Sequence, residues 1–231
     1  MILAATTPFD PAPLWLSVRL AAVTTSILLL LGVPLAALIA RGRFRGRAVL
    51  ATFVSLPLVL PPSVLGFYLL VAFSPSRPFG ALIERVFDCR LAFSFTGLVI
   101  GSVLYSLPFM VHPIQAGLEA LPPSLAEASY TLGKGRFTTL LRVLLPNIRP
   151  SLLTGIVLSF AHTLGEFGVV LMIGGNIPGV TRVAALAIYD EVETMHYAAA
   201  HTYAAILFGV SFCILLAVHM INGRFLKESV R

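Results

Sequence analysis

Charged residues are scarce in this sequence of 231 residues, because Asp, Glu, Lys and Arg together make up only 11%. A soluble globular chain carries roughly 25% charged residues, since its folded surface must face water. Hydrophobic residues make up 58% of the chain, and several apolar stretches reach the length of about 20 residues that a helix needs to cross a bilayer core. The composition excludes an ordinary soluble domain and predicts an all-α membrane protein.

Cysteine is rare, and metal-ligand and nucleotide-binding patterns are missing. Cys89 is expected in an external loop and Cys213 inside a span, so we do not expect them to form a disulfide. The histidines share no ligand spacing, and no metal site is expected. The phosphate-binding pattern G-x-x-x-x-G-K-[ST] does not occur, because Gly133-Lys134-Gly135 does not fit its spacing.

No internal repeat is visible, and aromatic and basic residues do not interleave. Many secondary transporters are built from internal repeats, so the absence of a visible repeat argues against a secondary transporter. The net charge of +6 would indicate nucleic acid in a soluble protein. Here the basic residues cluster beside apolar stretches, so we expect no nucleic-acid partner. We attribute the positive charge to the loops that orient the chain in a membrane, which are enriched in Lys and Arg on the cytoplasmic side.

The apolar stretches predict about five transmembrane helices. Their expected ranges are 14–40, 48–73, 93–118, 152–173 and 203–221. Pro57, Pro61 and Pro62 interrupt the second span, and Pro108 and Pro113 fall in the third. A proline inside a span frees a backbone carbonyl, which is tolerated against protein or water but not against lipid. The two spans are therefore expected either to line a pathway or to contain simple packing kinks.

The basic residues predict the orientation of the chain. Residues 41–47, residues 118–150 and the segment after residue 221 hold eleven of the sixteen Lys and Arg residues. Cytoplasmic loops are enriched in Lys and Arg. We therefore expect these three segments on the cytoplasmic side, with the N-terminus outside, the C-terminus inside and residues 174–202 in an external loop.

The longest connection on the basic side is predicted to form a helical hairpin. Ser124 is expected to cap its first helix, and Glu127 is expected to complete a capping box. Gly133 is expected to end that helix in a left-handed conformation. A second helix is expected over 136–145 and is expected to end at Pro146. Such a hairpin presents a compact surface to a soluble partner.

This hairpin resembles the EAA loop of the permease subunits of ATP-binding cassette (ABC) importers. The family pattern is Glu-Ala-Ala, three residues, Gly, nine residues, an aliphatic residue, any residue, Leu and Pro. The matching residues are Glu127, Ala128, Ser129, Gly133, Val143, Leu145 and Pro146. Ser129 and Val143 are mild departures from the pattern. An ordinary amphipathic surface hairpin is the alternative interpretation.

The resemblance implies a fold, a location and a set of partners. Residues 14–221 would form an ABC type 1 transmembrane domain, a multi-pass protein of the cytoplasmic (inner) membrane. The first hairpin helix would dock on a separate ABC ATPase subunit, which would bind ATP and Mg, so this chain is expected to be neither an enzyme nor a cofactor-binding protein. A periplasmic oxyanion-binding protein, a second permease copy and membrane lipid are the other implied partners.

Further stretches resemble the molybdate branch of these permeases. They are Leu-Pro-Leu-Val-Leu-Pro-Pro-Ser-Val-Leu-Gly-Phe-Tyr at 56–68, Leu-Gly-Glu-Phe-Gly at 164–168, Gly-Asn-Ile-Pro-Gly at 175–179, Thr-Arg at 181–182 and Ala-Ile-Tyr at 187–189. The element at 164–168 is similar in sulfate and thiosulfate permeases, so it indicates the oxyanion class. The stretches after residue 176 favour molybdate; tungstate, sulfate and thiosulfate are the alternatives.

The fourth span carries one polar stripe. Ser159, His162, Thr163 and Glu166 are spaced as i, i+3, i+4 and i+7, so they are expected to face the bundle interior, where a dianion needs a polar route. Glu166 is interpreted either as a pathway or gate residue, or as a structural residue that pairs with Arg19 or caps freed backbone groups. His162 is either a hydrogen-bonded interior histidine or a substrate contact.

Two functions from other classes would use the same stripe. An intramembrane enzyme would employ Glu166, His162 and Ser159 as an acid–base group, but nothing in the sequence fixes their geometry, so no catalytic residue is assigned. A proton-coupled carrier would use Glu166 as its relay. Neither function explains the EAA loop.

The external segment 174–202 is long and acidic at one point. Asp190, Glu191 and Glu193 lie close together within it. Such a segment is interpreted as a solvated loop or, as the family resemblance implies, as a docking surface for the substrate-binding protein, and the two interpretations are compatible. Selectivity would then lie mostly in that partner.

Overall fold

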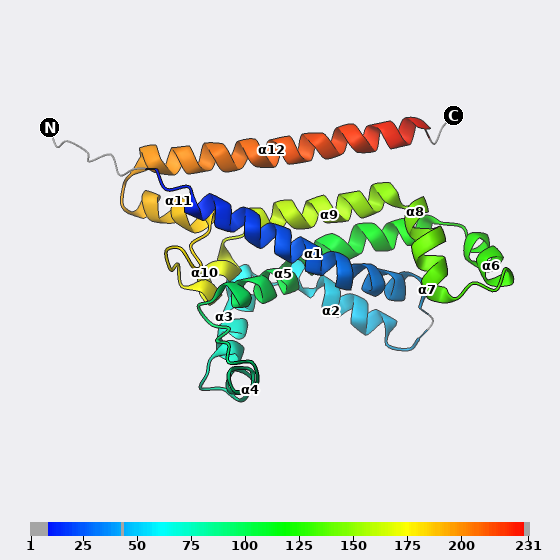
Figure 1. Ribbon diagram of the computed structural model, residues 1–231, viewed down its shortest axis with the longest axis horizontal. Helices are drawn as coiled ribbons and strands as arrows, with labels where there is room; N and C mark the ends of the chain where they lie inside the picture. The colour runs from blue at the N-terminus through cyan, green and yellow to red at the C-terminus, as the bar shows by residue number, and fades with distance from the viewer. Residues whose placement is uncertain (1–8, 43, 229–231) are drawn as a thin grey trace.

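The computed structural model describes residues 9–42 and 44–228, and every regular element in these residues is helical (Figure 1). Four long helices run side by side: α1 (Ala12–Arg41), α5 (Phe95–Ala120), α9 (Arg149–Leu164) and α12 (Tyr197–Glu228). Helices α1, α5 and α9 pack on one another, whereas α12 lies outside against α9 and α11. The expected helical bundle is confirmed.

Small residues let the three central helices approach closely. A Cβ atom on Gly32 of α1 would lie 2.7 Å from Met110 Cγ of α5, and one on Gly155 of α9 would lie 3.0 Å from the Met110 carbonyl oxygen. Glycine at such crossings is typical of helices that pack within a membrane. Leu28, Ile114 and other fully buried side chains fill the space beside these contacts.

The second apolar stretch is a broken helix. It forms α2 (Arg47–Val59) and α3 (Pro62–Phe73), whose axes differ by 111°. Leu60 and Pro61 between them are extended, because a residue that precedes proline is disfavoured in the helical region. Pro62 then starts α3, since its fixed φ suits the first helical position. Pro57 stays inside α2.

The fourth apolar stretch is also broken, which corrects the expectation of one continuous span over 152–173. Helix α9 ends at Leu164, and α10 (Gly168–Gly174) follows after a three-residue connection. Gly165 begins this connection and Gly168 follows it, and glycine is a poor helix former. Glu166 therefore lies in the break and not on the helical face that carries the other three polar residues.

The basic-side hairpin begins differently from the expected pattern. Helix α6 (Pro123–Thr131) starts at the proline, with Pro122 as its N-cap residue and no side-chain cap. The expected capping box of Ser124 and Glu127 is therefore wrong. Proline at the first helical position presets φ and lacks an N–H that would be unpaired there, so the helix starts one residue before the serine can cap it.

The end of α6 confirms the expected left-handed glycine. Gly133 has φ +72°, and its N–H donates to the Tyr130 carbonyl at 2.9 Å while the Lys134 N–H donates to the Ser129 carbonyl at 3.1 Å. This pair of bonds is the Schellman arrangement that terminates many helices.

The second arm of the hairpin runs through its proline. It consists of α7 (Arg136–Thr139), a π-helical segment η1 (Leu140–Leu144) and α8 (Leu145–Asn147). The expectation that this arm ends at Pro146 is wrong by one residue. In the wider π turn, the Leu145 N–H donates to the Leu140 carbonyl. This turn accommodates Pro146 without ending the helix.

Two helices lie where the sequence predicts loops. Helix α4 (Pro78–Phe87) stands between α3 and α5, and α11 (Ala184–Glu193) occupies the middle of the segment expected as an external loop. Helix α12 also begins at Tyr197, before the expected start of the fifth span at residue 203.

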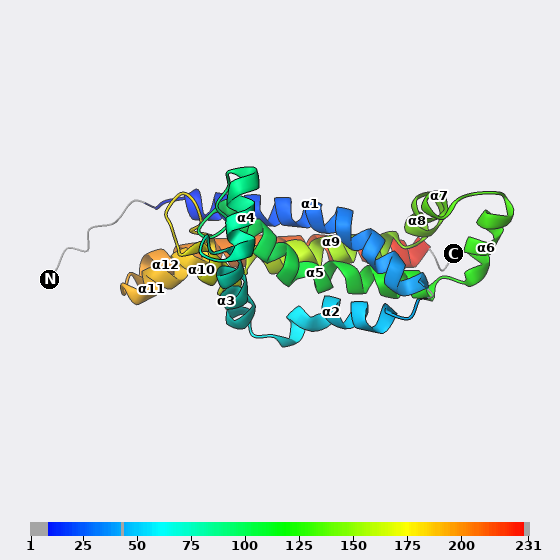
Figure 2. The same cartoon turned by 90° about the horizontal axis from the view of Figure 1, so that it is seen from below.

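The predicted segregation of charge is present in the fold. The α1–α2 connection, the α6–α8 hairpin and the end of α12 gather at one end of the bundle, whereas α3, α4, α10 and α11 gather at the other (Figures 1 and 2). We call the first the basic end and the second the opposite end. Two of the basic residues used for the orientation, Arg43 and Arg231, lie outside the described residues.

Candidate functional site: a pocket at two helix breaks

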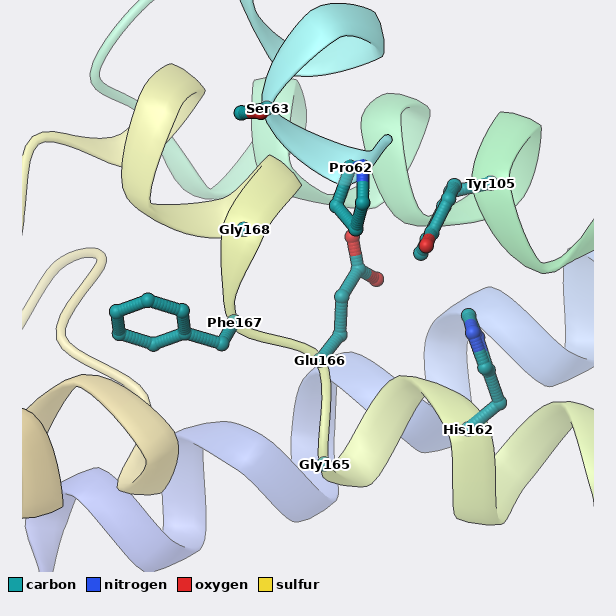
Figure 3. Close-up of a pocket in the computed structure, with 8 residues that line it drawn as sticks. All are labelled: Pro62, Ser63, Tyr105, His162, Gly165, Glu166, Phe167 and Gly168. Carbon is teal, nitrogen blue, oxygen red and sulfur yellow. The ribbon is translucent and has the colours of Figure 1, made fainter. Parts of the chain in front are cut away.

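The two helix breaks meet at one place in the bundle. A Cβ atom on Gly168, where α10 begins, would lie 2.6 Å from the Pro62 Cβ, where α3 begins, and one on Gly66 would lie 2.7 Å from the Met172 Cβ. An open pocket of about 520 Å³ lies at this junction (Figure 3). Its lining residues are Pro62, Ser63, Tyr105, His162, Gly165, Glu166, Phe167 and Gly168.

Glu166 places a buried carboxyl group in this pocket. The residue is 5% exposed, and neither carboxyl oxygen has a hydrogen-bond partner among the described residues. The Ser102 hydroxyl interacts with the carboxyl group, but outside hydrogen-bonding geometry. Figure 3 shows the side chain reaching from the break towards Pro62. An unpaired buried charge costs several kcal/mol, so packing alone does not account for this residue.

The structural roles expected for Glu166 are not formed. Arg19 lies on the exposed side of α1, where its guanidinium carbon is 4.7 Å from the Phe95 ring centroid. The expected Arg19 pair is therefore wrong, because Arg19 faces away from the interior into which its neighbours Ser17 and Leu20 point. A capping role is also wrong, since the carboxyl oxygens accept no hydrogen bond from the described backbone.

The other three stripe residues line one side of α9. Ser159 and Thr163 are fully buried, at 0% and 2% exposure, and His162 is half-buried. His162 and Thr163 contact Ser106 of α5, which packs against α9. The prediction that these residues face the bundle interior is confirmed, and the stripe leads along α9 to the break that holds Glu166.

His162 is held firmly in the pocket wall. Its Nδ1 atom shares a hydrogen bond of 2.9 Å with the Ser106 hydroxyl, which lies 3.0 Å from the Thr163 hydroxyl. The imidazole stacks on Phe109 at 4.0 Å between ring centroids and lies 5.0 Å from the Tyr105 ring. These contacts support the interpretation of a hydrogen-bonded interior histidine.

The sequence reasoning missed the contribution of α5 to this site. Tyr105 lines the pocket, Ser102 faces Glu166, and Ser106 and Phe109 hold His162. These residues follow helical spacing along an otherwise apolar span. A polar and aromatic stripe in the third span was the signal that could have found them.

The EAA-like residues divide into two groups in the hairpin. Glu127 and Ala128 are exposed on α6, whereas Val143 and Leu145 pack against the hydrophobic core. The Ser129 hydroxyl is buried and lies 2.9 Å from the Thr139 hydroxyl. The departure from the family pattern at Ser129 thus provides a hydrogen bond that joins the two arms.

The end of α5, which leads into the hairpin, contacts the end of α1 and the start of α2. An Arg41 nitrogen donates to the Leu118 carbonyl at 3.1 Å, and Arg47 pairs with Glu119 at 2.9 Å. Ala126 of α6 and Leu144 of the second arm belong to the same hydrophobic cluster as the core of α1 and α5. A displacement of the hairpin would therefore be transmitted to these two helices.

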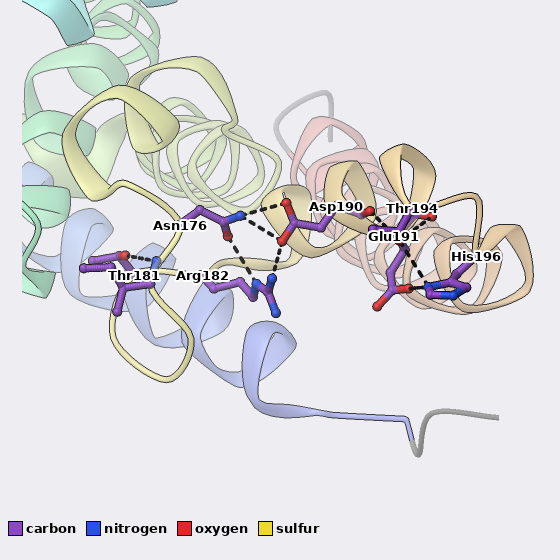
Figure 4. A network of polar contacts seen from close by, with 8 residues as sticks. Asn176, Thr181, Arg182, Asp190, Glu191, Thr194 and His196 are labelled. Atoms are coloured by element: carbon purple, nitrogen blue, oxygen red, sulfur yellow. Dashed lines mark hydrogen bonds and ion pairs between the residues drawn. The ribbon is translucent and has the colours of Figure 1, made fainter. Parts of the chain in front are cut away.

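The opposite end of the bundle is held by a polar network (Figure 4). The Asn176 side chain donates to both Asp190 oxygens at 2.7 and 2.8 Å, Arg182 pairs with Asp190, and the Arg182 Nε donates to the Asn176 oxygen at 3.2 Å. Glu191 pairs with His196 at 3.2 Å. This segment is therefore not a simple solvated loop, because its acidic residues fasten α11 in place.

Comparisons with known proteins place these features in a family. Residues 32–227 match the family described as binding-protein-dependent transport system inner membrane component. The molybdenum transport system permease protein ModB of Azotobacter vinelandii is 48% identical and the match covers 91% of this chain and 93% of that protein. The sulfate transport system permease protein CysT of Salmonella typhimurium is 35% identical, covering 86% of this chain and 72% of that protein.

A solved structure shares the fold. A chain of a bacterial ABC transporter involved in the import of the acidic polysaccharide alginate superposes with a TM-score of 0.75 and 17% identity, covering 95% of this chain and 80% of that one. The shared architecture extends over nearly the whole chain.

Proposed function

Since the chain belongs to the family of binding-protein-dependent transport system inner membrane components, we propose that it is the permease subunit of an ATP-driven importer that carries molybdate. The observation that carries the choice of anion is the 48% identity to a molybdenum permease over more than nine-tenths of both chains. The sulfate relatives are more distant, at 35% identity for CysT of Salmonella typhimurium. Tungstate is a tetrahedral dianion of similar size, and we expect it to compete with molybdate.

The hairpin is the proposed docking surface for the ATPase subunit. Helix α6 stands at the basic end and exposes Glu127 and Tyr130, and Leu132, which follows the helix, is exposed beside them. Exposed apolar residues on a small knob favour contact with a protein partner. The positive-inside rule places the basic end in the cytoplasm, where ATP and Mg are bound by that partner. A second permease copy would complete the pathway between the two chains.

The pocket at the two helix breaks is the proposed gate of the pathway. Irregular backbone at membrane depth is tolerated where it lines a cavity or is buried in protein, and both breaks lie at this pocket. A buried carboxyl group repels a dianion when it is ionised. Glu166 would therefore keep the anion from resting at the gate, and high-affinity recognition would belong to a periplasmic oxyanion-binding protein that docks at the opposite end.

The contacts in the pocket argue against an intramembrane enzyme. An acid–base group requires a nucleophile, a base and an orienting residue within mutual reach. Among the described residues, the Ser159 hydroxyl has no hydrogen-bond partner, and the imidazole of His162 is bound to Ser106. A proton-coupled carrier with Glu166 as its relay would not need the hairpin or the ATPase.

The test is molybdate uptake in cells that lack the gene for this chain. We expect molybdate-dependent growth to fail when molybdate is scarce, to return with excess molybdate, and to return with the intact gene, while high-affinity sulfate uptake persists. Sulfate auxotrophy in the deletion strain would assign the chain to sulfate transport. Uptake by purified complex in vesicles without ATP would instead support the carrier.

A further inference from the structure

Helix α4 presents an apolar surface that its neighbours do not cover. Successive residues of a helix are turned by about 100°, which places the large apolar side chains of α4 on one continuous arc and Glu84 and Arg85 on the other side. The bundle covers only one edge of this arc, where Gly80 lies against the end of α3 and Ile83 packs into a hydrophobic cluster. The rest of the arc is formed by Phe79, Leu82 and Val86, which are 51%, 57% and 62% exposed.

The position of α4 indicates what covers this surface. Figure 1 views the helix end-on and Figure 2 views it from the side, lying crosswise to α1 and α5. In both views it stands beside the first turns of these helices and not beyond the end of the bundle. Helix α1 has 30 residues, more than the about 20 that cross a bilayer core, so its first turns are expected at the headgroup level. A helix that lies crosswise at that level is parallel to the membrane plane.

The charges around α4 fit the same environment. Arg77 precedes the helix and Arg85 lies on its polar side; both are exposed, and neither pairs with another described residue, whereas Arg90 pairs with Glu84 at 2.7 Å. Glu84 is the acidic residue on the polar side of α4, and its pairing with Arg90 leaves Arg85 as the unpaired charge there. An amphipathic helix with a charged polar face is typical of segments that lie in the headgroup region. The long arginine stems keep the guanidinium groups in water near lipid phosphates.

We propose that α4 lies in the headgroup layer of the bilayer at the opposite end of the bundle. Phe79, Leu82 and Val86 insert between acyl chains, and Arg77 and Arg85 face the lipid phosphates. The lipid contact would fix the level of the bundle in the membrane and support the bend between α2 and α3, because α3 leads directly into α4. A soluble protein partner is the other possible occupant, but such a partner would meet the end of the bundle at α11 before its flank at α4.

The test uses single cysteines in the full chain with Cys89→Ser and Cys213→Ser as background. Leu82→Cys and Val86→Cys report the apolar arc, and Ala81→Cys on the same helix is the matched control on the other side. Each single-cysteine variant is labelled with an environment-sensitive fluorophore and reconstituted in vesicles of phosphatidylcholine and phosphatidylglycerol. Nitroxide-carrying lipids are expected to quench the labels at 82 and 86 several-fold more than the label at 81.

Equal and weak quenching at all three positions would overturn the proposal. Weak lipid quenching together with shielding of 82 and 86 on addition of the periplasmic binding protein would also overturn it and assign the surface to that protein. These outcomes do not depend on which anion is carried, since the placement of α4 follows from the spans alone.

Discussion

The surroundings of Glu166 indicate a functional role. Its carboxyl oxygens have no hydrogen-bond partner among the described residues, and the side chain lines the pocket at both helix breaks. A residue that stabilised the fold through a charge would be expected to have a partner. Replacement of its charge therefore tests a transport role more directly than a structural one.

Glu166→Gln is expected to leave assembly intact and to change transport. The amide has nearly the same shape, no ion pair is lost, and a neutral group is less costly to bury than an unpaired charge. We expect the yield of folded complex to be unchanged or higher, and the rate of molybdate uptake to change by about tenfold, equivalent to about 1.4 kcal/mol. The measurements are complex yield and uptake into vesicles, with Asp88→Asn, which removes one exposed carboxylate, as control. Normal uptake with normal yield would show that Glu166 is not part of the gate.

At the scale of elements, the hairpin depends on one backbone conformation. Gly133 and Gly135 both have open space around the position of a Cβ atom, but only Gly133 has a left-handed φ, at +72°. A β-branched residue in that conformation is strained by about 1–3 kcal/mol. The two glycines therefore form a matched pair that separates backbone strain from steric bulk.

Gly133→Val is expected to reach the membrane but to lose ATP-driven uptake, while Gly135→Val keeps it. The strain would tilt the second arm away from α6 and misplace Glu127 and its neighbours, whereas the spans insert because of their apolar length. Pull-down of the ATPase subunit and uptake into vesicles measure the effect. If Gly133→Val binds its ATPase and transports at the normal rate, the hairpin is not the coupling element.

The elements that the sequence predicts correctly are those with a strong local signal. Long apolar stretches predict α1, α5 and α12, and the Pro61-Pro62 pair predicts the first break. The second break was missed because α10 is apolar throughout, so its residues extend the apolar stretch of α9 and were assigned to the same span. Local reasoning also could not foresee that a proline would begin α6 ahead of Ser124.

Only one side of the pocket was predicted from the sequence. The stripe on α9 follows helical spacing and was found, whereas Tyr105 lies on another span and joins the site only through packing of α5 against α9. Helix α4 was missed for a similar reason, since ten residues between two spans carry no signal strong enough to distinguish a short helix from a loop.

At the scale of the whole molecule, the charge segregation predicts which end meets the cytoplasm. The basic end holds the hairpin and the α1–α2 connection, and Cys89 lies in the connection between α4 and α5 at the opposite end. From the positive-inside rule we therefore expect Cys89 on the external side of the membrane.

Cys89 is expected to react with a membrane-impermeant thiol reagent added outside spheroplasts, in a Cys213→Ser background. A cysteine at the exposed position 131 of α6, introduced as Thr131→Cys with Cys89→Ser, should react only after lysis. The readout is the extent of labelling before and after lysis. The reverse pattern, with position 131 labelled first, would invert the orientation and place the hairpin outside.

The contact between Gly168 and Pro62 restricts how this sequence can drift during evolution. The two positions are far apart in the chain, yet the Pro62 Cβ atom occupies the space that any side chain at 168 would need. Every residue except glycine carries a Cβ atom, so replacing the proline alone does not make room for an alanine at 168. The glycine at 168 is therefore expected to be inherited unchanged among descendants, even in those that have replaced the proline at 62.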